Sequence, residues 1–163
     1  MVSTKQLAKA DREHRVFELF AKSLSWHLAA NAVESRPEPE PDILYHGVND
    51  STAFELAEIC ASDVAVQRGQ LMKTGGVSAI WTSDPTEEIL HNKLIKPYQS
   101  DHPIELLCYH DGRVITPDSD IVLVIQDELK IRNEHSFQRI WYFGEESIFE
   151  ISAAGDILRS ISL

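Results

Sequence analysis

The sequence has only two cysteines, Cys60 and Cys108, among 163 residues. Neither belongs to a Cys-x-x-Cys pair or to a Cys/His spacing that could build a zinc site. Both lie in apolar runs, where a reduced cysteine packs as a small hydrophobic side chain. We therefore expect reduced, structural cysteines and no zinc centre.

Long apolar runs are also absent. No stretch approaches the roughly eighteen consecutive apolar residues that indicate a transmembrane helix. The N-terminal stretch MVSTKQLAKADREHR has no apolar segment of the kind found in secretory signals. These absences predict a cytoplasmic protein that does not contact a membrane.

Three nucleotide-binding and nucleophile motifs are missing as well. The sequence contains no G-x-x-x-x-G-K-[ST] loop, no G-x-G-x-x-G and no G-x-S-x-G. Its seven histidines include no pair spaced i, i+4 as on a zinc-binding helix. Phosphate-cradling loops and helix-borne zinc sites are thus not predicted.

Basic residues are few, 15 Lys and Arg against 26 Asp and Glu, which gives a net charge of −11. Residues 1–36 hold six basic and four acidic side chains (+2), and the remainder holds nine and twenty-two (−13). An acidic body repels phosphate backbones. Nucleic acid is therefore a possible but disfavoured partner, and a basic protein is another possible partner.

The length fits one domain with one core. We expect residues 1–36 to form an N-terminal helix packed on an α/β core over residues 37–163. Apolar residues recur every three to four positions through residues 4–32, which predicts the helix. The following SRPEPEPD has alternating prolines, which favour an extended linker.

A β-hairpin is predicted after the linker. Residues 43–46 and 52–59 flank Gly47-Val48-Asn49-Asp50-Ser51, whose composition suits a tight reversal. The second arm has an alternative reading, because its apolar residues could also cover one side of a helix capped by Ser51.

Later segments alternate between helices and strands. Thr82-Ser83-Asp84-Pro85 combines a capping residue with a proline suited to the first turn of a helix. The apolar run IELLCY, residues 104–109, is typical of a buried central strand. The predicted elements after the hairpin are a short helix at 62–71, a strand at 77–81, a helix to about 96, a strand at 104–109, a helix at 120–130, and strands at 137–143 and 147–151. This order predicts an α/β fold with a mixed β-sheet flanked by helices.

Two acidic residues of the hairpin suggest a metal site. Asp42 follows Pro41 directly and Glu55 lies thirteen residues on, so pairing of the two arms could bring the carboxylates together. Two carboxylates, with waters completing an octahedron, suffice to hold Mg²⁺. We therefore expect Asp42 and Glu55 to be metal ligands.

On these residues the chain resembles the PD-(D/E)XK, or restriction-endonuclease-like, superfamily. Pro41-Asp42 and Glu55 match its acidic motif positions, whereas Ala57 stands where the family has lysine. The resemblance implies a restriction-endonuclease-like core, with Lys93 or Lys96 supplying the basic group and Glu18 or Glu13 a further acid. It implies a Mg²⁺-dependent nuclease, a hydrolase acting on DNA phosphodiesters, or a catalytically degenerate member of that fold.

Two alternatives remain open. LYHGV and AIWTSDP resemble the NAD-binding motifs of ADP-ribosyltransferases, which would implicate His46, Trp81 and Glu146 or Glu150. This reading requires residues 51–60 to be helical. The acidic body also suits a non-enzymatic immunity or inhibitor protein that occupies a basic partner.

Overall fold

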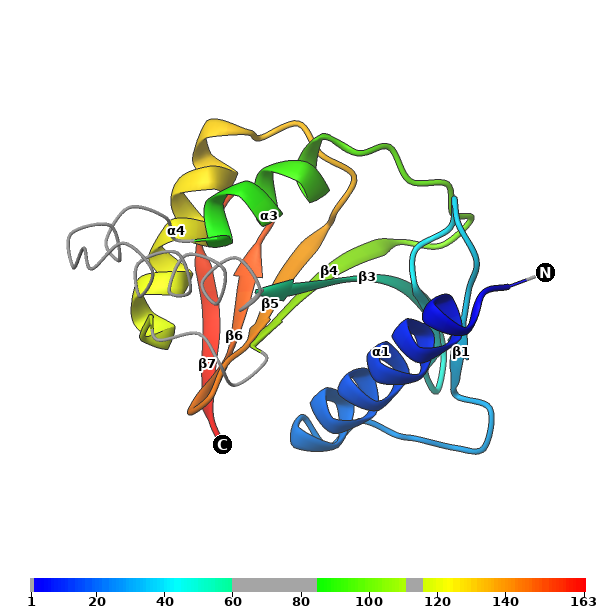
Figure 1. The fold of residues 1–163 in the computed structure, drawn as a ribbon. Helices are drawn as coiled ribbons and strands as arrows, with labels where there is room; N and C mark the ends of the chain where they lie inside the picture. The colour runs from blue at the N-terminus through cyan, green and yellow to red at the C-terminus, as the bar shows by residue number, and fades with distance from the viewer. Residues whose placement is uncertain (1, 60–84, 111–115) are drawn as a thin grey trace, which may run out of the picture.

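The computed structural model describes residues 2–59, 85–110 and 116–163. These residues form a seven-stranded sheet in the order β1-β2-β3-β4-β5-β6-β7, with α1 on one side and α3 and α4 on the other (Figure 1). None of the helices in these ranges is long and apolar enough to cross a membrane. The predicted helix at 62–71 and strand at 77–81 lie outside the described residues.

Helix α1 spans Thr4–Ser23. It begins with a capping box, in which Ser3 accepts the Gln6 backbone N–H and the Gln6 side chain accepts the Ser3 N–H. The predicted end near residue 32 is wrong, because the chain leaves the helix at Leu24 and Ser25 has a positive φ of 57°. Leu24 and Leu28 still pack on the α1 side of the sheet beyond Ser23, so the apolar spacing continued past the end of the helix.

The predicted hairpin is confirmed. Strand β2 (Ile43–His46) pairs antiparallel with β3 (Ser51–Ile59), and Gly47 donates its N–H to the Asp50 carbonyl at 2.8 Å in the turn. The helical alternative for the second arm is therefore excluded. A short strand, β1 (Val33–Ser35), was not predicted; it pairs with β2 and overlaps the predicted linker only at Ser35.

The sheet continues through two parallel connections. Helix α3 (Pro85–Ile95) precedes β4 (Ile104–His110), which pairs parallel with β3. Helix α4 (Asp118–Ile131) precedes β5 (Arg139–Phe143), which pairs parallel with β4. Strand β4 is buried from Ile104 to Tyr109, as expected for a central strand.

Two antiparallel strands complete the sheet. Strand β6 (Ser147–Ser152) pairs with β5, as predicted, and β7 (Ile157–Ser162) pairs with β6. Strand β7 was not predicted. The α/β class, with a mixed sheet flanked by helices and an N-terminal helix, is confirmed.

The core has two parts because side chains of the central strands alternate between faces. Phe54 and Leu56 of β3 pack with α1, whereas Ala53 and Ala57 face α3 and α4. The α1 side is aromatic and the other side is largely aliphatic. The largest fully buried side chains on the α1 side are Phe17, Phe20, Phe54 and Trp141, and those on the other side include Leu90, Leu106, Ile121, Ile125 and Tyr142.

Strand β3 is longer than its partner β2. The β2 pairing ends at Ile43 with Phe54, whereas the β4 pairing continues to Ile59. The part of β3 from Glu55 onward therefore has β4 on one side and no β2 pair on the other. This step in the sheet edge lies between α1 and α3.

Candidate functional site

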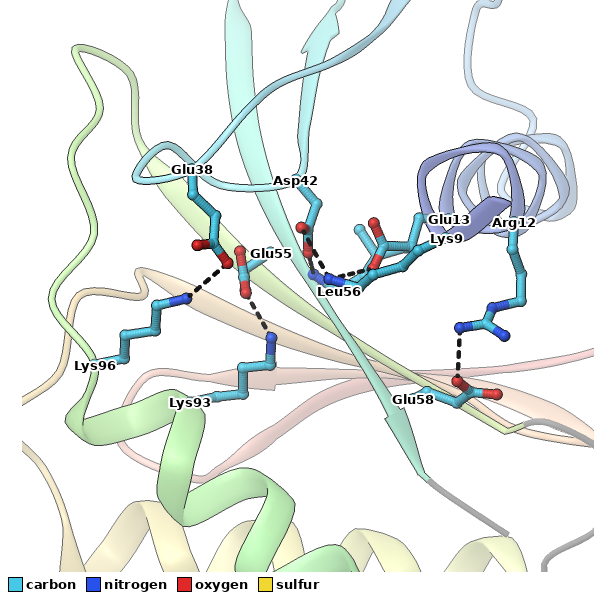
Figure 2. Close-up of polar contacts among 10 residues, drawn as sticks. All are labelled: Lys9, Arg12, Glu13, Glu38, Asp42, Glu55, Leu56, Glu58, Lys93 and Lys96. Carbon is cyan, nitrogen blue, oxygen red and sulfur yellow. Dashed lines mark hydrogen bonds and ion pairs between the residues drawn. The ribbon is translucent and has the colours of Figure 1, made fainter. Parts of the chain in front are cut away.

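Asp42 lies at the step, immediately before β2. Its Oδ2 accepts the backbone N–H of Leu56 at 3.0 Å (Figure 2). The carboxylate thus takes the place of the strand that would otherwise pair with Leu56. Since Ile43 pairs with Phe54, continuing the register places Asp42 opposite Glu55, as the hairpin reasoning predicted.

Glu55 projects to the α3 side of the sheet. Its side chain is 4% exposed, and its Oε1 lies 2.5 Å from Nζ of Lys93 on α3. Burial raises the pKa of Glu55, the negative charge of Asp42 raises it further, and Lys93 opposes both effects. The structure therefore brings together Asp42, Glu55 and Lys93, three of the residues predicted for the site.

Helix α1 contributes a second acid and base. Nζ of Lys9 lies 3.2 Å from Oε1 of Glu13 and 3.9 Å from Oδ1 of Asp42 (Figure 2). Burial first, and then the charge of Asp42, raise the pKa of Glu13 to about 7. Burial lowers the pKa of Lys9, but Asp42, Glu13 and Glu55 together raise it more. Three carboxylates therefore act on one ammonium group.

Two further predicted residues pair with other side chains, although the charge of Lys96 still lowers the pKa of Glu55. Glu18 pairs with His14 at 3.2 Å on α1 and takes no part in the cluster, so Glu13 supplies the helix-borne acid. Nζ of Lys96 lies 3.7 Å from Glu38, a side chain that is 84% exposed. Sequence spacing alone does not prefer Glu13 to Glu18, because each lies four residues from a lysine, Lys9 and Lys22 respectively.

Tyr98 was missed by sequence reasoning. Its hydroxyl oxygen is buried and makes no hydrogen bond within the described part of the chain. Burial raises the pKa of this phenol, and the charge of Glu55 raises it further. A buried phenol therefore lies within electrostatic range of Glu55.

The residues of the NAD-binding alternative that the structure describes do not form one site. His46 contacts Ser51 and Glu34, whereas Glu150 is paired with Arg139 and Arg159 across β5, β6 and β7. Trp81 lies outside the described residues. The strand conformation of β3 also contradicts the helix that this alternative requires.

The described ranges contain no group of three or more His, Cys, Asp or Glu side chains arranged to hold a metal ion as they stand. The carboxylates of Glu13, Asp42 and Glu55 are instead neutralised by Lys9 and Lys93. A metal ion would have to replace an ammonium group. We name Lys9, Glu13, Asp42, Glu55 and Lys93 the charged cluster.

No protein-family model and no curated protein matches the chain. A solved structure does match, with a TM-score of 0.52 and 17% sequence identity over 95% of this chain and 83% of the other. It belongs to a protein of unknown function from Pseudomonas aeruginosa strain PAO1, described as a member of the Monooxygenase Superfamily. At this identity the likeness concerns the fold alone.

These comparisons contradict the predicted membership of the PD-(D/E)XK superfamily. The matching structure is assigned to a different superfamily, so the predicted DNA-cleaving hydrolase is not retained. The ADP-ribosyltransferase-like and immunity-protein alternatives gain no support either.

Proposed function

We propose that the protein binds a divalent cation, with Mg²⁺ as the first candidate, through Glu13, Asp42 and Glu55. The observation that carries the proposal is the position of Lys9, whose ammonium group lies between Glu13 and Asp42 and within electrostatic range of Glu55. The fold thus already places a positive charge among three carboxylates. A metal ion would take the place of that charge.

The donor set suits a hard cation. Mg²⁺ prefers carboxylate oxygens, often uses only one or two of them, and keeps several waters. The Lys9 side chain is 53% exposed, so it can move into solvent and release Glu13 and Asp42. The buried hydroxyl of Tyr98, next to Glu55, could hydrogen-bond a water carried by the ion.

The raised pKa of Glu13 supports the same proposal. Burial is the larger cause of that pKa of about 7, and the negative charge of Asp42 is the second. A bound divalent cation would compensate it and displace the proton. Such an ion also acidifies a water that it binds, which would give the cluster acid–base chemistry.

Isothermal titration calorimetry with Mg²⁺ and Mn²⁺ tests the proposal. We expect the wild type to bind and Asp42→Asn/Glu55→Gln to lose binding, because that variant lacks two of the three ligand charges. The control is Glu87→Gln/Glu88→Gln, which removes the same charge from exposed positions of α3. Equal affinities of the two double variants would refute the proposed site.

A second comparison separates the cluster from a diffuse acidic surface. Lys9→Met should bind the cation more tightly than the wild type, because the competing ammonium group is gone. Binding near neutral pH should also release a fraction of a proton from Glu13, measured by repeating the titration in buffers of different ionisation enthalpy. Unchanged affinity in Lys9→Met together with no proton release would contradict the proposal.

A further inference from the structure

Three polar side chains form a second cluster at the other end of β2 from Asp42. Nδ1 of His46 lies 2.9 Å from Oγ of Ser51, and Nε2 of His46 lies 3.1 Å from Oε2 of Glu34. The contacts link β1, β2 and β3. A hydroxyl, an imidazole and a carboxylate are thus connected in one line.

Strand register explains the arrangement. His46 and Ser51 are direct partners across the β2–β3 hairpin, next to its turn. Glu34 is the partner of Leu44 in the β1–β2 pair, and His46 lies two residues after Leu44 on the same face. The backbone of three paired strands therefore holds the side chains in reach of one another.

The chemistry of the carboxylate determines which imidazole nitrogen carries the proton. Ionised Glu34 can only accept hydrogen bonds, so Nε2 of His46 must be the donor. In a neutral imidazole Nδ1 is then an acceptor, and the hydroxyl of Ser51 must donate to it. The hydrogen-bond direction is the one that general-base activation of a serine needs.

Glu34 is itself held in place. Nη1 of Arg36 lies 2.6 Å from Oε1 of Glu34, and Nη2 of the same guanidinium lies 2.8 Å from Glu40. The hydrogen bonds from His46 and Arg36 lower the pKa of Glu34, which keeps the carboxylate ionised. Arg36 thus leaves Oε2 free to orient the imidazole.

We propose that Ser51 is an activated nucleophile for small, activated carboxylic esters, with His46 as its general base and Glu34 as a positioning residue. A nucleophile hydrogen-bonded to a base that a third group orients is the recurring arrangement of acyl transfer. The side chains of His46 and Glu34 are 41% and 45% exposed, and Ser51 is partly exposed. A small ester in solution can therefore reach the cluster.

The reaction balances with water as the second reactant. Oγ of Ser51 attacks the acyl carbon, its proton moves to Nδ1 of His46, the bond to the leaving oxygen breaks, and that oxygen takes the proton. Water then attacks the acyl-serine, gives its proton to Nδ1, and the proton returns to Oγ as the acid leaves. Glu34 keeps its charge and stabilises the imidazolium in both steps.

The test is covalent labelling with a fluorophosphonate, followed by peptide mass spectrometry, together with the hydrolysis rate of p-nitrophenyl acetate. We expect the label on Ser51 in the wild type and no label on that peptide in Ser51→Ala. His46→Gln should slow labelling about a hundredfold, as the loss of a general base does. Glu34→Gln should slow it less, because the base remains.

Ser147→Ala is the matched control, since Ser147 is the partly exposed first residue of another strand, β6. It should label and hydrolyse as the wild type does. Circular dichroism establishes that each variant is folded before its rate is compared. Absence of a label on Ser51 in the wild type, or equal labelling rates in the wild type and a folded His46→Gln, would overturn the proposal and leave a purely structural cross-strand contact.

Discussion

The ammonium group of Lys93 lies 2.5 Å from the carboxylate of Glu55, although 38 positions separate the two residues in the sequence. The pair links α3 to β3 at the step where β2 no longer pairs with β3. Glu55 is almost wholly buried and Lys93 is 22% exposed. Removal of either partner should therefore affect both stability and the charged cluster.

Lys93→Met should destabilise the protein by about 2 kcal/mol near neutral pH, because it leaves the charge of Glu55 buried without its partner. The value lies below that of a fully buried pair because solvent reaches Lys93. Urea unfolding measures the loss. Lys96→Met is the control and should change stability by less than about 0.5 kcal/mol, because its partner Glu38 is exposed.

The double variant Lys93→Met/Glu55→Gln completes a thermodynamic cycle. It should recover much of the loss, because no buried charge remains. Additive effects of the two single substitutions would show that the close contact contributes no coupling energy.

The raised pKa of Glu13 predicts a pH dependence of stability. The folded protein holds this proton up to a pKa of about 7, whereas the unfolded chain loses it near 4.5. The folded state therefore binds more protons between these values, and the contribution of Glu13 to stability falls as the pH rises through the window. Glu13→Gln removes this loss, so its stability relative to the wild type should rise by about 1–2 kcal/mol between about pH 4 and pH 8.

Chemical denaturation of both proteins across this pH range measures the difference. Glu55 and Glu105 also have raised pKa values, so the wild-type profile contains their contributions with the same sign. The difference between the wild type and Glu13→Gln isolates Glu13. Parallel pH profiles of the two proteins would mean that Glu13 does not hold a proton in this way.

Substitution of Gly144 should destabilise the protein, because the Asp118 side chain lies next to it. A Cβ on Gly144 would lie 2.4 Å from the Asp118 carboxylate. That carboxylate accepts hydrogen bonds from Tyr142 Oη and the backbone N–H groups of Glu145 and Glu146, which join α4 to the β5–β6 turn. Asp118→Ala should therefore cost about 2 kcal/mol of unfolding free energy, and Gly144→Ala about as much.

The two substitutions should not add. Once Asp118→Ala has removed the carboxylate, the three atoms nearest to a Cβ at Gly144 are gone, so Gly144→Ala should cost less than about 0.5 kcal/mol. Unfolding in urea of the two single variants and the double variant gives the coupling energy. A full additional loss in the double variant would place the strain of Gly144→Ala in the backbone and not at Asp118.

Trp141 should contribute to stability through a hydrogen bond as well as through the packing of its ring. Its Nε1 donates to Oε2 of Glu105 at 2.8 Å, and Glu105 is 4% exposed. Trp141→Phe keeps an aromatic ring but removes the donor, so we expect a loss of about 2–3 kcal/mol in thermal or urea unfolding. The loss should be smaller when Glu105→Gln is also present, because the neutral amide is less costly to leave buried without this donor.

Secondary structure was predicted correctly where turn residues or buried apolar runs mark an element clearly. The turn residues between His46 and Ser51 predicted the hairpin, and the apolar run from Ile104 predicted the central strand. It failed where side chains outside an element continue its pattern. Leu24 and Leu28 pack on the aromatic core from beyond Ser23 and so extended the apparent period of α1. Strand β7, with exposed Ile157 and Leu158, has no buried face to produce a clear alternation.

The candidate site was predictable only in part. The hairpin register alone places Asp42 opposite Glu55. The contacts of Lys93, Glu13 and Tyr98 depend on how helices and a loop pack on the sheet, which sequence spacing does not determine. The nuclease resemblance named Lys93, and the structure does place Lys93 next to Glu55. The fold comparison nevertheless contradicts the predicted superfamily and its function.

The position of β3 inside the sheet, between β2 and β4, has a consequence for synthesis on the ribosome. One edge of β3 pairs with β2, which is synthesised earlier. The other edge pairs with β4, so Ala53 has no backbone partner on that side until Ile104 has been synthesised. Until then a mostly apolar strand presents unsatisfied backbone groups to other nascent chains. Aggregation during expression should therefore be most sensitive to substitutions that slow the arrival or docking of β4.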